Sequence, residues 1–520
     1  MRLAVAIVIY RPRLAELQAG LEAIAQACAQ GSTVAVHLWH NDEGQQATPG
    51  LALVVERLRA RGLAVRIGGG GGNLGFGRAI NAILPAIAAD HLLLLNQDAI
   101  PEPGALERLW AVAREDGPQV AAWELRQIPY EHPKDYDPVS GETGWVSGAA
   151  VLLRTQALRE VGGFEPRFFM YCEDVDLSWR LRCAGWRLRY LPQCAVVHRT
   201  YAVAHEVKPL AAIEGAYANL CLRTRFAGRS ELWQGLRQHV QALRAPPRFP
   251  GQHAGLRRAL LRFARDFPHF RRTRCAAPDF APFFPGADYE MRREGAFFPF
   301  LAQHEQGRAR PPLSALVRAS GDAQGLADWL RCLAQQTQPP QEVIVVGADD
   351  PVLHAVIARA DLGFPCRPLP SLASPLGAIA AVHAQADWWL LFADDRERPY
   401  ADHAEVLLQA ALQQGADGAA GLRWVVQASA REHAAAHRLH APRTVLAGPP
   451  GERPALLMHR PAAGAEPARI AEVDKLTTLS YQPPAPIEPA TAGTTSPRAL
   501  PRSGAQSAAS RTAATPAAAP

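Results

Sequence analysis

Hydrophobic and polar residues follow two different periods along the first hundred positions. Short apolar runs typical of β-strands occupy residues 3–10, 33–41, 63–68 and 91–98, and amphipathic stretches with helical spacing occupy residues 14–30, 50–62 and 76–89. Strands separated by helices of this length form right-handed βαβ units on a parallel sheet. Since ligands of such sheets bind beyond the carboxyl ends of the strands, the pattern predicts an α/β fold with one functional edge.

The alternation is interrupted after Asp98 and resumes in the second half. An irregular stretch at residues 126–144 precedes a compact run from Trp145 to Arg199, and a second alternating pattern begins near residue 311. The last forty residues are mainly Pro, Ala, Ser and Thr, which bury too little apolar surface to offset their ordering entropy. We expect four segments: an α/β domain at 1–204, a helical arginine-rich extension at 205–305, a second, smaller α/β domain at 306–480, and a disordered tail at 481–520.

Size and composition are those of a soluble globular protein with several cores. A chain of 520 residues is longer than a domain with a single hydrophobic core, and 48% of the residues are hydrophobic. The apolar run at the N-terminus is strand-sized and lacks a following small-residue cleavage site, so we expect a cytoplasmic protein rather than a secreted one. The eight cysteines include no Cys-x-x-Cys pair, which favours free thiols.

Positive charge is concentrated in one segment. Residues 221–274 contain thirteen arginines against two acids, a local excess of +11 in a chain whose net charge is +6. Such a segment is either a solvated helical face or a surface that attracts anionic lipid or nucleic acid. No nucleic-acid-binding motif accompanies the arginines, so a peripheral contact with an anionic membrane is the favoured functional interpretation and nucleic acid is not expected as a partner.

A glycine-rich loop follows the third predicted strand. Its Gly70, Gly72 and Gly75 match the Gly-x-Gly-x-x-Gly pattern of dinucleotide-binding proteins, and Asp98 lies about 20 residues farther on at a strand end. In those proteins, however, the glycine turn follows the first strand, whereas here it follows the third. An NAD(P)-dependent oxidoreductase is therefore kept as an alternative and is not the favoured interpretation.

The sequence CEDVDLSWRLRCAG, residues 172–185, predicts a short helix. Leu177 and Leu181 lie on one face, Gly185 suits the C-terminal end, and Glu173 and Asp174 fall at the helix start. Backbone N–H groups there stabilise negative charge, so Asp174 is either a helix cap or a functional carboxylate.

Five motifs in order resemble the family 2 glycosyltransferases, and most of all their bacterial rhamnosyltransferase-type branch. They are GGNLGFGRAIN, LLLLNQDAIPEPGAL, GWVSGAAVLLR, VGGFEPRFFMYCEDVDLSWRLRCAGW and VVHR, which together span about residues 3–200. The resemblance implies a GT-A fold and transfer of a sugar from a nucleotide diphosphate donor, with inversion at the anomeric carbon.

The resemblance also implies roles for individual residues. Asp98 occupies the position of the family's metal-binding Asp-x-Asp motif, and His198 that of a histidine near the diphosphate, so a divalent ion, Mn²⁺ or Mg²⁺, is the expected cofactor. Asp174, next to Glu173, aligns with the catalytic base. The remaining candidates are donor-binding residues and two residues of the acceptor pocket: Tyr10, Asn41, Asp42, Asn73, Gly75, Arg78, Asn81 and Arg180 for the donor, with Trp145 and Gly148 for the acceptor.

Two departures from the family pattern weaken the expected donor contacts. His40 replaces the aspartate that contacts the nucleotide base, and the NQD sequence at residues 96–98 carries a single acid.

The second half resembles the opening of another family 2 domain, with Asp394 and Asp395 at its acidic strand end. No Glu-Asp helix follows them, so we expect a degenerate, non-catalytic copy, with an unrelated α/β domain as the alternative.

The expected function is transfer of a sugar, rhamnose by resemblance, to a polysaccharide or lipid-linked saccharide acceptor in surface glycan synthesis. The alternatives are the oxidoreductase and a non-catalytic scaffold in which both halves have decayed.

Overall fold

The structure is a computed structural model. It describes residues 2–28, 34–42, 50–131, 134, 136–199, 208–275, 298–302, 310–427, 444–445, 456–460 and 469–482. Residues Met1–Pro483 form one compact unit. The domain boundaries predicted from the sequence stay a prediction, and nearly all of the predicted tail at 481–520 lies outside the described residues.

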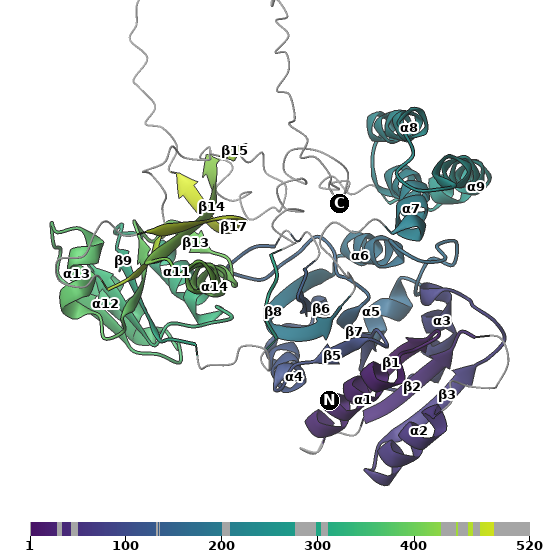
Figure 1. Ribbon diagram of the computed structural model, residues 1–520, viewed down its shortest axis with the longest axis horizontal. Helices are drawn as coiled ribbons and strands as arrows, with labels where there is room; N and C mark the ends of the chain where they lie inside the picture. The colour runs from purple at the N-terminus through teal and green to yellow at the C-terminus, as the bar shows by residue number, and fades with distance from the viewer. Residues whose placement is uncertain are drawn as a thin grey trace, which may run out of the picture. The chain divides into compact units, whose positions relative to one another are not determined.

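The first half is built on an eight-stranded mixed sheet in the order β3-β2-β1-β4-β7-β6-β8-β5 (Figure 1). Strands β1 to β4 run parallel, β7 is antiparallel to both β4 and β6, β8 is parallel to β6, and β5 is antiparallel to β8. The strand bounds are β1 Leu3–Ile9, β2 Val34–His40, β3 Ala64–Gly69, β4 His91–Leu95, β5 Ala99–Pro101, β6 Val120–Ile128, β7 Ala150–Arg154 and β8 Arg187–His198.

Helices cover both faces of this sheet. They are α1 Leu14–Cys28, α2 Leu51–Ala60, α3 Phe76–Ile83, α4 Ala105–Glu115, α5 Thr155–Glu160 and α6 Glu173–Cys183, with a 3₁₀ turn at Leu84–Ala86. Along β1, Val5 and Ile7 point into the core under α1, α2 and α4, whereas Ala4 and Ala6 point into the core under α3, α5 and α6. A strand buried on both faces is apolar at nearly every position, which explains the continuous run in the sequence.

The predicted α/β fold class is confirmed, with element ends displaced by a few residues. The helix expected at 76–89 ends as an α-helix at Ile83 because Pro85 lacks the N–H that would continue it. The prediction of irregular structure at residues 126–144 is wrong at its start, because β6 continues to Ile128.

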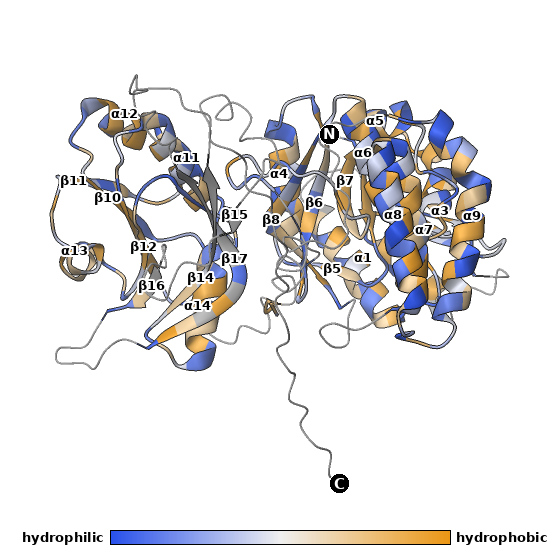
Figure 2. Cartoon of the chain, turned by 90° about the horizontal axis from the view of Figure 1, so that it is seen from above, coloured by the Kyte–Doolittle hydropathy of each residue, from blue (hydrophilic) through white to orange (hydrophobic). Residues whose placement is uncertain are grey.

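Within the described residues, the first sheet is followed by the helices α7 Pro209–Phe226, α8 Arg229–Arg244 and α9 Gln252–Arg272. Both outer helices approach α7 through glycine. A Cβ on Gly235 of α8 would lie 2.7 Å from the Arg223 side chain, and one on Gly255 of α9 would lie 2.3 Å from Ile213. Figure 2 shows hydrophilic and hydrophobic residues alternating along these helices, which agrees with one face of each being packed.

A buried ionic network joins this helical segment to the first sheet. Arg225 of α7 is 1% exposed and pairs with Asp176 of α6, which is fully buried, and its Nη2 lies 2.6 Å from Glu165 Oε2. His269 of α9 also contacts Glu165, with 2.8 Å between Nε2 and Oε2. The arginine-rich segment is therefore only partly a solvated surface.

The second half is built on a nine-stranded sheet that repeats the first in topology. Its main path is β11-β10-β9-β12-β16-β14-β17-β13, with β15 paired to β14. Its elements are β9 Leu313–Arg318, α11 Ala323–Ala334, β10 Glu342–Val346, α12 Pro351–Arg359, β11 Cys366–Leu369, α13 Leu376–His383, β12 Trp388–Phe392, β13 Glu397–Pro399, α14 His403–Gln414, β14 Gly418–Gln427, β15 Thr444–Val445, β16 Leu456–His459 and β17 Ile470–Gln482.

Each pair on that path corresponds to a pair in the first sheet and has the same direction. The β9–β10, β10–β11, β9–β12 and β14–β17 pairs are parallel, and the β12–β16, β14–β16 and β13–β17 pairs are antiparallel. One segment differs in length. Residues 155–186 carry α5 and α6 between β7 and β8, whereas only residues 460–469 separate β16 from β17. The second half thus has no room for a counterpart of α6.

The two halves share packing at the ends of β6 and β8. Ile128 and Val197 belong to the core formed by Leu326, Trp329 and other residues of the second half. Beside them Arg126 Nη1 lies 2.8 Å from Glu405 Oε2, and both side chains are buried.

In the described part of the chain, no helix has the length and apolar character needed to cross a membrane. The seven cysteines whose side chains are described are all free thiols, as expected.

Replacing Arg225 by methionine should lower the free energy of unfolding by about 3–5 kcal/mol, because Asp176 and Glu165 would stay buried without their cation. Urea unfolding measures this. The exposed Arg229 begins α8 and forms no ion pair within the described residues, so Arg229→Met should change stability by less than about 0.5 kcal/mol. Equal effects of the two changes would contradict a structural role for the network.

Candidate active site

The candidate residues of the first half gather where its strands end. Asp98 follows β4, His198 is the last residue of β8, and Tyr10 and Asn41 follow β1 and β2. The Asn96 N–H donates to the Ala149 carbonyl, next to Gly148, whose own N–H binds Asp174 at the start of α6. The edge of the sheet that the sequence predicts to be functional therefore carries both the expected metal ligands and the expected base.

Asp98 and His198 are in direct contact. His198 Nε2 lies 3.3 Å from Asp98 Oδ1, and the histidine is 6% exposed. On its other side His198 Nδ1 lies 2.7 Å from Gln127 Oε1 at the end of β6. An amide oxygen only accepts, so Nδ1 carries the proton and the ring is held with Nε2 towards Asp98.

This arrangement fits a divalent cation. In neutral His198 with its proton on Nδ1, Nε2 is an acceptor that faces a carboxylate oxygen, and a ligating histidine commonly donates its other N–H to a carbonyl in this way. Burial raises the pKa of Asp98, but when His198 is protonated on both nitrogens its hydrogen bond and charge outweigh burial and bring that pKa below its usual value. No cluster of three or more His, Cys, Asp or Glu suited to a metal occurs in the described residues.

Asp174 is held at the first turn of α6 by two backbone amides. Gly148 N–H donates to Oδ2 at 2.9 Å, and Val175 N–H donates to Oδ1 at 2.8 Å. Each carboxylate oxygen keeps a second lone pair. Burial raises the pKa of Asp174, and the amides and the nearby Lys134 charge offset only part of that shift. A carboxylate with a raised pKa is a stronger base at neutral pH.

Glu173 is more deeply buried than its neighbour. Its side chain is 5% exposed, and Oε2 has no hydrogen-bond partner within the described residues. Burial, with the charge of Asp174 as a second cause, raises the pKa of Glu173 to about 8. This pKa favours the protonated form of Glu173 at neutral pH.

A lysine that the sequence analysis did not single out lies beside this pair. Lys134 Nζ is 2.6 Å from Glu124 Oε2 and 3.5 Å from the centre of the Trp145 ring. Burial lowers the pKa of Lys134, and it raises the pKa of Glu124 to about 7. This buried pair fixes Trp145, the residue expected at the acceptor side.

The glycine loop is shaped by close contacts of its backbone. Gly75 has φ of +80°, and a Cβ there would lie 2.0 Å from the Phe169 carbonyl oxygen, so no other residue fits without displacement. Asn41 holds the loop to β2, because its Nδ2 donates to the Gly75 carbonyl and its Oδ1 accepts from Leu74 N–H. Asn73 accepts from Gly75 N–H at 2.9 Å. The loop follows β3 at the edge of the sheet rather than β1.

Other predicted donor residues make structural contacts. The side-chain amide of Asn81 binds the backbone of Phe164 twice: Nδ2 donates to the carbonyl, and Oδ1 accepts from the N–H. Arg180 pairs with Asp176 at 2.7 Å and donates to the Val161 carbonyl, on the side of α6 that faces the buried network.

The last three donor candidates are more open. Tyr10 is 39% exposed, and its backbone N–H and carbonyl both bind the Gln97 side chain. Asp42 accepts from Arg11 N–H, and Arg78 is exposed. Nothing in the structure tests the donor roles, which stay predictions.

Gln127, Lys134 and Glu124 were missed in the sequence. Two of them lie in the stretch read as irregular, and the third lies just before it in β6. The run VAAWELRQI at 120–128, rich in β-branched and apolar residues, is the signal that predicts a strand there.

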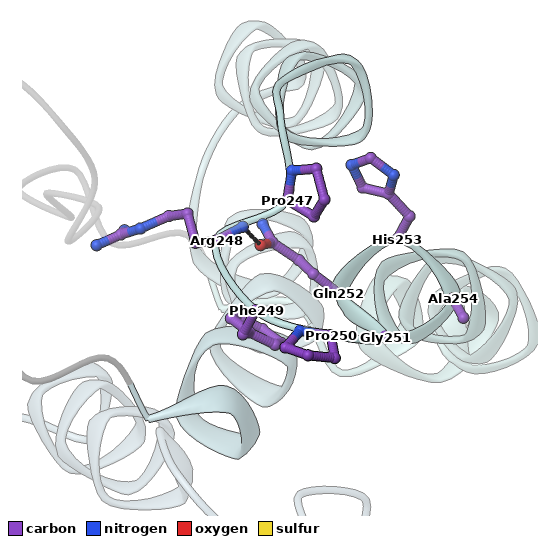
Figure 3. Close-up of a pocket in the computed structure, with 8 residues that line it drawn as sticks. All are labelled: Pro247, Arg248, Phe249, Pro250, Gly251, Gln252, His253 and Ala254. Carbon is purple, nitrogen blue, oxygen red and sulfur yellow. Dashed lines mark hydrogen bonds between the residues drawn. The ribbon is translucent and has the colours of Figure 1, made fainter.

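A surface pocket of about 460 Å³ lies in the turn between α8 and α9, lined by residues 247–254 (Figure 3). There Gln252 Oε1 accepts from Arg248 N–H, and His253 contacts the Ala245 carbonyl. None of the site residues named above lines it.

Curated relatives of the chain are glycosyltransferases. It is 29% identical over 174 residues to an N-acetylglucosaminyl-diphospho-decaprenol L-rhamnosyltransferase of Mycobacterium tuberculosis, covering 25% of this chain and 56% of the relative. It is 44% identical over 54 residues to the rhamnosyltransferase WbbL of Escherichia coli, covering 10% and 20%. A pre-mycofactocin glycosyltransferase of M. tuberculosis is 33% identical over 138 residues, covering 23% and 29%. At its longest, the chain spans about half the length of these relatives.

Solved glycosyltransferases overlap with the chain at low scores, and no family model matches it. A mannosyltransferase from Pyrobaculum calidifontis, in complex with GDP-Man and Mn²⁺, has a TM-score of 0.35 and 16% identity over 52% of this chain and 83% of that chain. TarS from S. aureus has a TM-score of 0.34 and 14% identity over 52% and 55%. Such partial overlaps say nothing of substrate or mechanism.

The raised pKa of Glu173 predicts a pH dependence of stability. Between about pH 4.5 and its folded pKa of about 8, folded Glu173 keeps a proton that the unfolded chain releases, so stability falls as pH rises through this window. The slope should approach, at most, about 1.4 kcal/mol per pH unit. Glu173→Gln cannot titrate, so urea unfolding at several pH values should show the variant gaining on the wild type as pH rises. Parallel stability curves would contradict the burial of an ionisable Glu173.

Proposed function

We propose that the first half of this chain is an inverting glycosyltransferase that moves a sugar, rhamnose, from a nucleoside diphosphate donor to a saccharide or lipid-linked acceptor in surface glycan synthesis. Its relatives named rhamnosyltransferases support the sugar and the pathway. The observation that carries the proposal is the joint placement, at one edge of the sheet, of the Asp98–His198 pair and the amide-bound Asp174.

Asp174 is the base in this proposal. Gly148 and Val175 fix the carboxylate without using all its lone pairs, so an acceptor hydroxyl can donate to it. As the hydroxyl oxygen bonds to the anomeric carbon, its proton passes to Asp174, and the bond from that carbon to the diphosphate oxygen breaks. The configuration is inverted because the displacement is single.

The donor diphosphate lies at Asp98 and His198. A divalent ion, Mn²⁺ or Mg²⁺, held by these two residues would offset the charge that builds on the departing diphosphate. Gln127 fixes the ring of His198 for this purpose, and the exposed Arg78 and Tyr10 with Asp42 complete the donor side.

The acceptor side is formed by Trp145 and Gly148. Lys134 stacks on the Trp145 ring, and a Cβ on Gly148 would lie 2.9 Å from Phe76, so the backbone there comes close to neighbouring side chains. Asn81 and Arg180 act indirectly in this proposal, because they hold in place the segments that they bind.

The second half is a non-catalytic copy in this proposal. Asp395 corresponds to Gln97, because Asp395 accepts from Ser320 N–H in the second half and Gln97 accepts from Tyr10 N–H in the first. The next residue, Arg396, therefore corresponds to Asp98. In the strand register Glu397 lies opposite Ser480, as Ala99 lies opposite His198. Both expected metal ligands are therefore replaced, and the segment that carries α6 is missing.

Asp174→Asn should lower the rate of sugar transfer by about 10²–10⁴-fold, since the amide cannot take the acceptor proton. Nucleoside diphosphate release from a panel of nucleotide sugars measures the rate, and calorimetry should show donor affinity roughly unchanged. Asp394→Asn in the second half is the matched control and should retain full activity. Wild-type rates in Asp174→Asn would refute the base, and a loss in Asp394→Asn would refute a silent second half.

Gln127→Leu should weaken Mn²⁺ binding by about 10–100-fold, because His198 would lose the partner that orients it. Titration of Mn²⁺ into the protein with donor present measures the affinity. Gln335 has an amide that donates to the Val139 carbonyl, away from the site, so Gln335→Leu should leave Mn²⁺ binding unchanged. If the Mn²⁺ affinity of Gln127→Leu equals that of the wild type, the proposed role of an oriented His198 in metal binding is contradicted.

A further inference from the structure

The outer face of α8 combines cationic and apolar side chains in a single stripe. Trp233, Arg237, Val240 and Arg244 recur at intervals of four, three and four residues, which places them on one side of the helix. All four are exposed, Trp233 to 72% and Val240 to 40%. A large aromatic residue that is open to solvent on an arginine-rich helix is an exception to the usual burial of such residues.

The outer face of α9 has the same character. Arg257, Arg258, Leu261, Arg265 and Arg272 are exposed, and Leu261 is exposed to 72%. The opposite side of α9, with Leu256 and other apolar residues, is buried.

Both stripes face away from α7. Gly235 of α8 and Gly255 of α9 lie against α7 side chains, and the stripe residues occupy the other sides of the two helices. His239 of α8 contacts the Leu256 carbonyl of α9, so the two outer helices are in contact as well (Figure 1). We call the exposed residues of the stripes the α8–α9 face.

Apart from Arg265, the arginines of this face form no ion pair in the part of the chain that the structure describes. The two acids of the segment pair with Arg223 and Arg265, and Arg225 and Arg262 pair with acids of other elements. Among the described residues, the other nine arginines of the segment form no ion pair. They are Arg229, Arg237, Arg244, Arg248, Arg257, Arg258, Arg271, Arg272 and Arg274.

We propose that the α8–α9 face binds the surface of an anionic lipid bilayer. Five arginines of the face form no ion pair within the described residues, and their guanidinium groups complement negatively charged headgroups: Arg237, Arg244, Arg257, Arg258 and Arg272. Trp233, Val240 and Leu261 enter the boundary between headgroups and acyl chains, where apolar area is removed from water.

Exposed aliphatic groups distinguish lipid from nucleic acid. A nucleic-acid surface would match the arginines, yet single strands are gripped by several stacked aromatic rings, and the stripes offer one, Trp233. Val240 and Leu261 gain nothing beside phosphates but are buried by a bilayer.

The face is connected to the candidate active site. Arg225 of α7 is bound to Asp176, two residues after Asp174, so docking of α8 and α9 fixes the orientation of α6 relative to the bilayer. Lipid binding itself does not depend on the proposed sugar transfer, and its test uses no sugar substrate.

Co-sedimentation of the full chain with vesicles tests the proposal. We expect binding to vesicles of phosphatidylcholine with phosphatidylglycerol, weak or no binding to phosphatidylcholine alone, and loss of binding as salt rises. Equal binding to both vesicle types, or none to either, would overturn the proposal.

Two sets of variants locate the contact. Joint replacement of Arg237, Arg244 and Arg258 by glutamine should raise the lipid concentration for half-maximal binding by about tenfold or more. The control removes the same charge from Arg57, Arg61 and Arg66, which are exposed on or beside α2, and should leave binding nearly unchanged. Trp233→Ser with Leu261→Ser should weaken binding while the salt dependence remains.

Equal losses in the arginine set and its control would show that net charge, not this face, attracts lipid. Tighter binding to single-stranded RNA than to the anionic vesicles at the same salt would replace lipid by nucleic acid as the partner.

Discussion

The structure depends on the buried contact of Arg225 with Asp176 and Glu165. A buried charge destabilises the fold unless it is paired with an opposite charge. Here the guanidinium group of Arg225 in α7 pairs with one carboxylate from α6 and one from the loop before it. The first turn of α6 thereby serves two purposes. Asp174 points to the Gly148 amide at the edge of the sheet, and Asp176 points to the helical segment. The position of the expected base is consequently set by residues some fifty positions later in the chain.

Periodicity was sufficient to predict the strands and helices around β1 to β4, since each strand is buried on both faces and each helix on one. The meeting of Asp98 with His198 followed from resemblance alone, because no local pattern links residues a hundred positions apart. The partner of His198 was missed, since Gln127 lies in the stretch at residues 126–144 that was interpreted as irregular. Arg180 was predicted to bind the donor by resemblance; its ion pair with Asp176, and the pairing of Asp176 with the distant Arg225, are not revealed by the sequence around residue 180.

The second half contributes to the site of the first by packing. The ends of β6 and β8, which carry Gln127 and His198, lie in a core shared with the second half, and Arg126 is bound to Glu405 of α14. A sheet without its own catalytic helix still supports the strands whose ends hold the expected metal ligands. This accounts for the compactness of Met1–Pro483 as a single unit.

Because the two sheets have one topology, each strand on the path of the first sheet has a counterpart in the second. Features found in both, such as the apolar parallel strands and the polar corner where β4 or β12 ends, are what folding requires. Features found once among the described residues, namely residues 155–186 with α5 and α6 and the histidine at 198, are those on which the proposed chemistry rests. If the proposal holds, one polypeptide contains both the fold with this chemistry and the same fold without it.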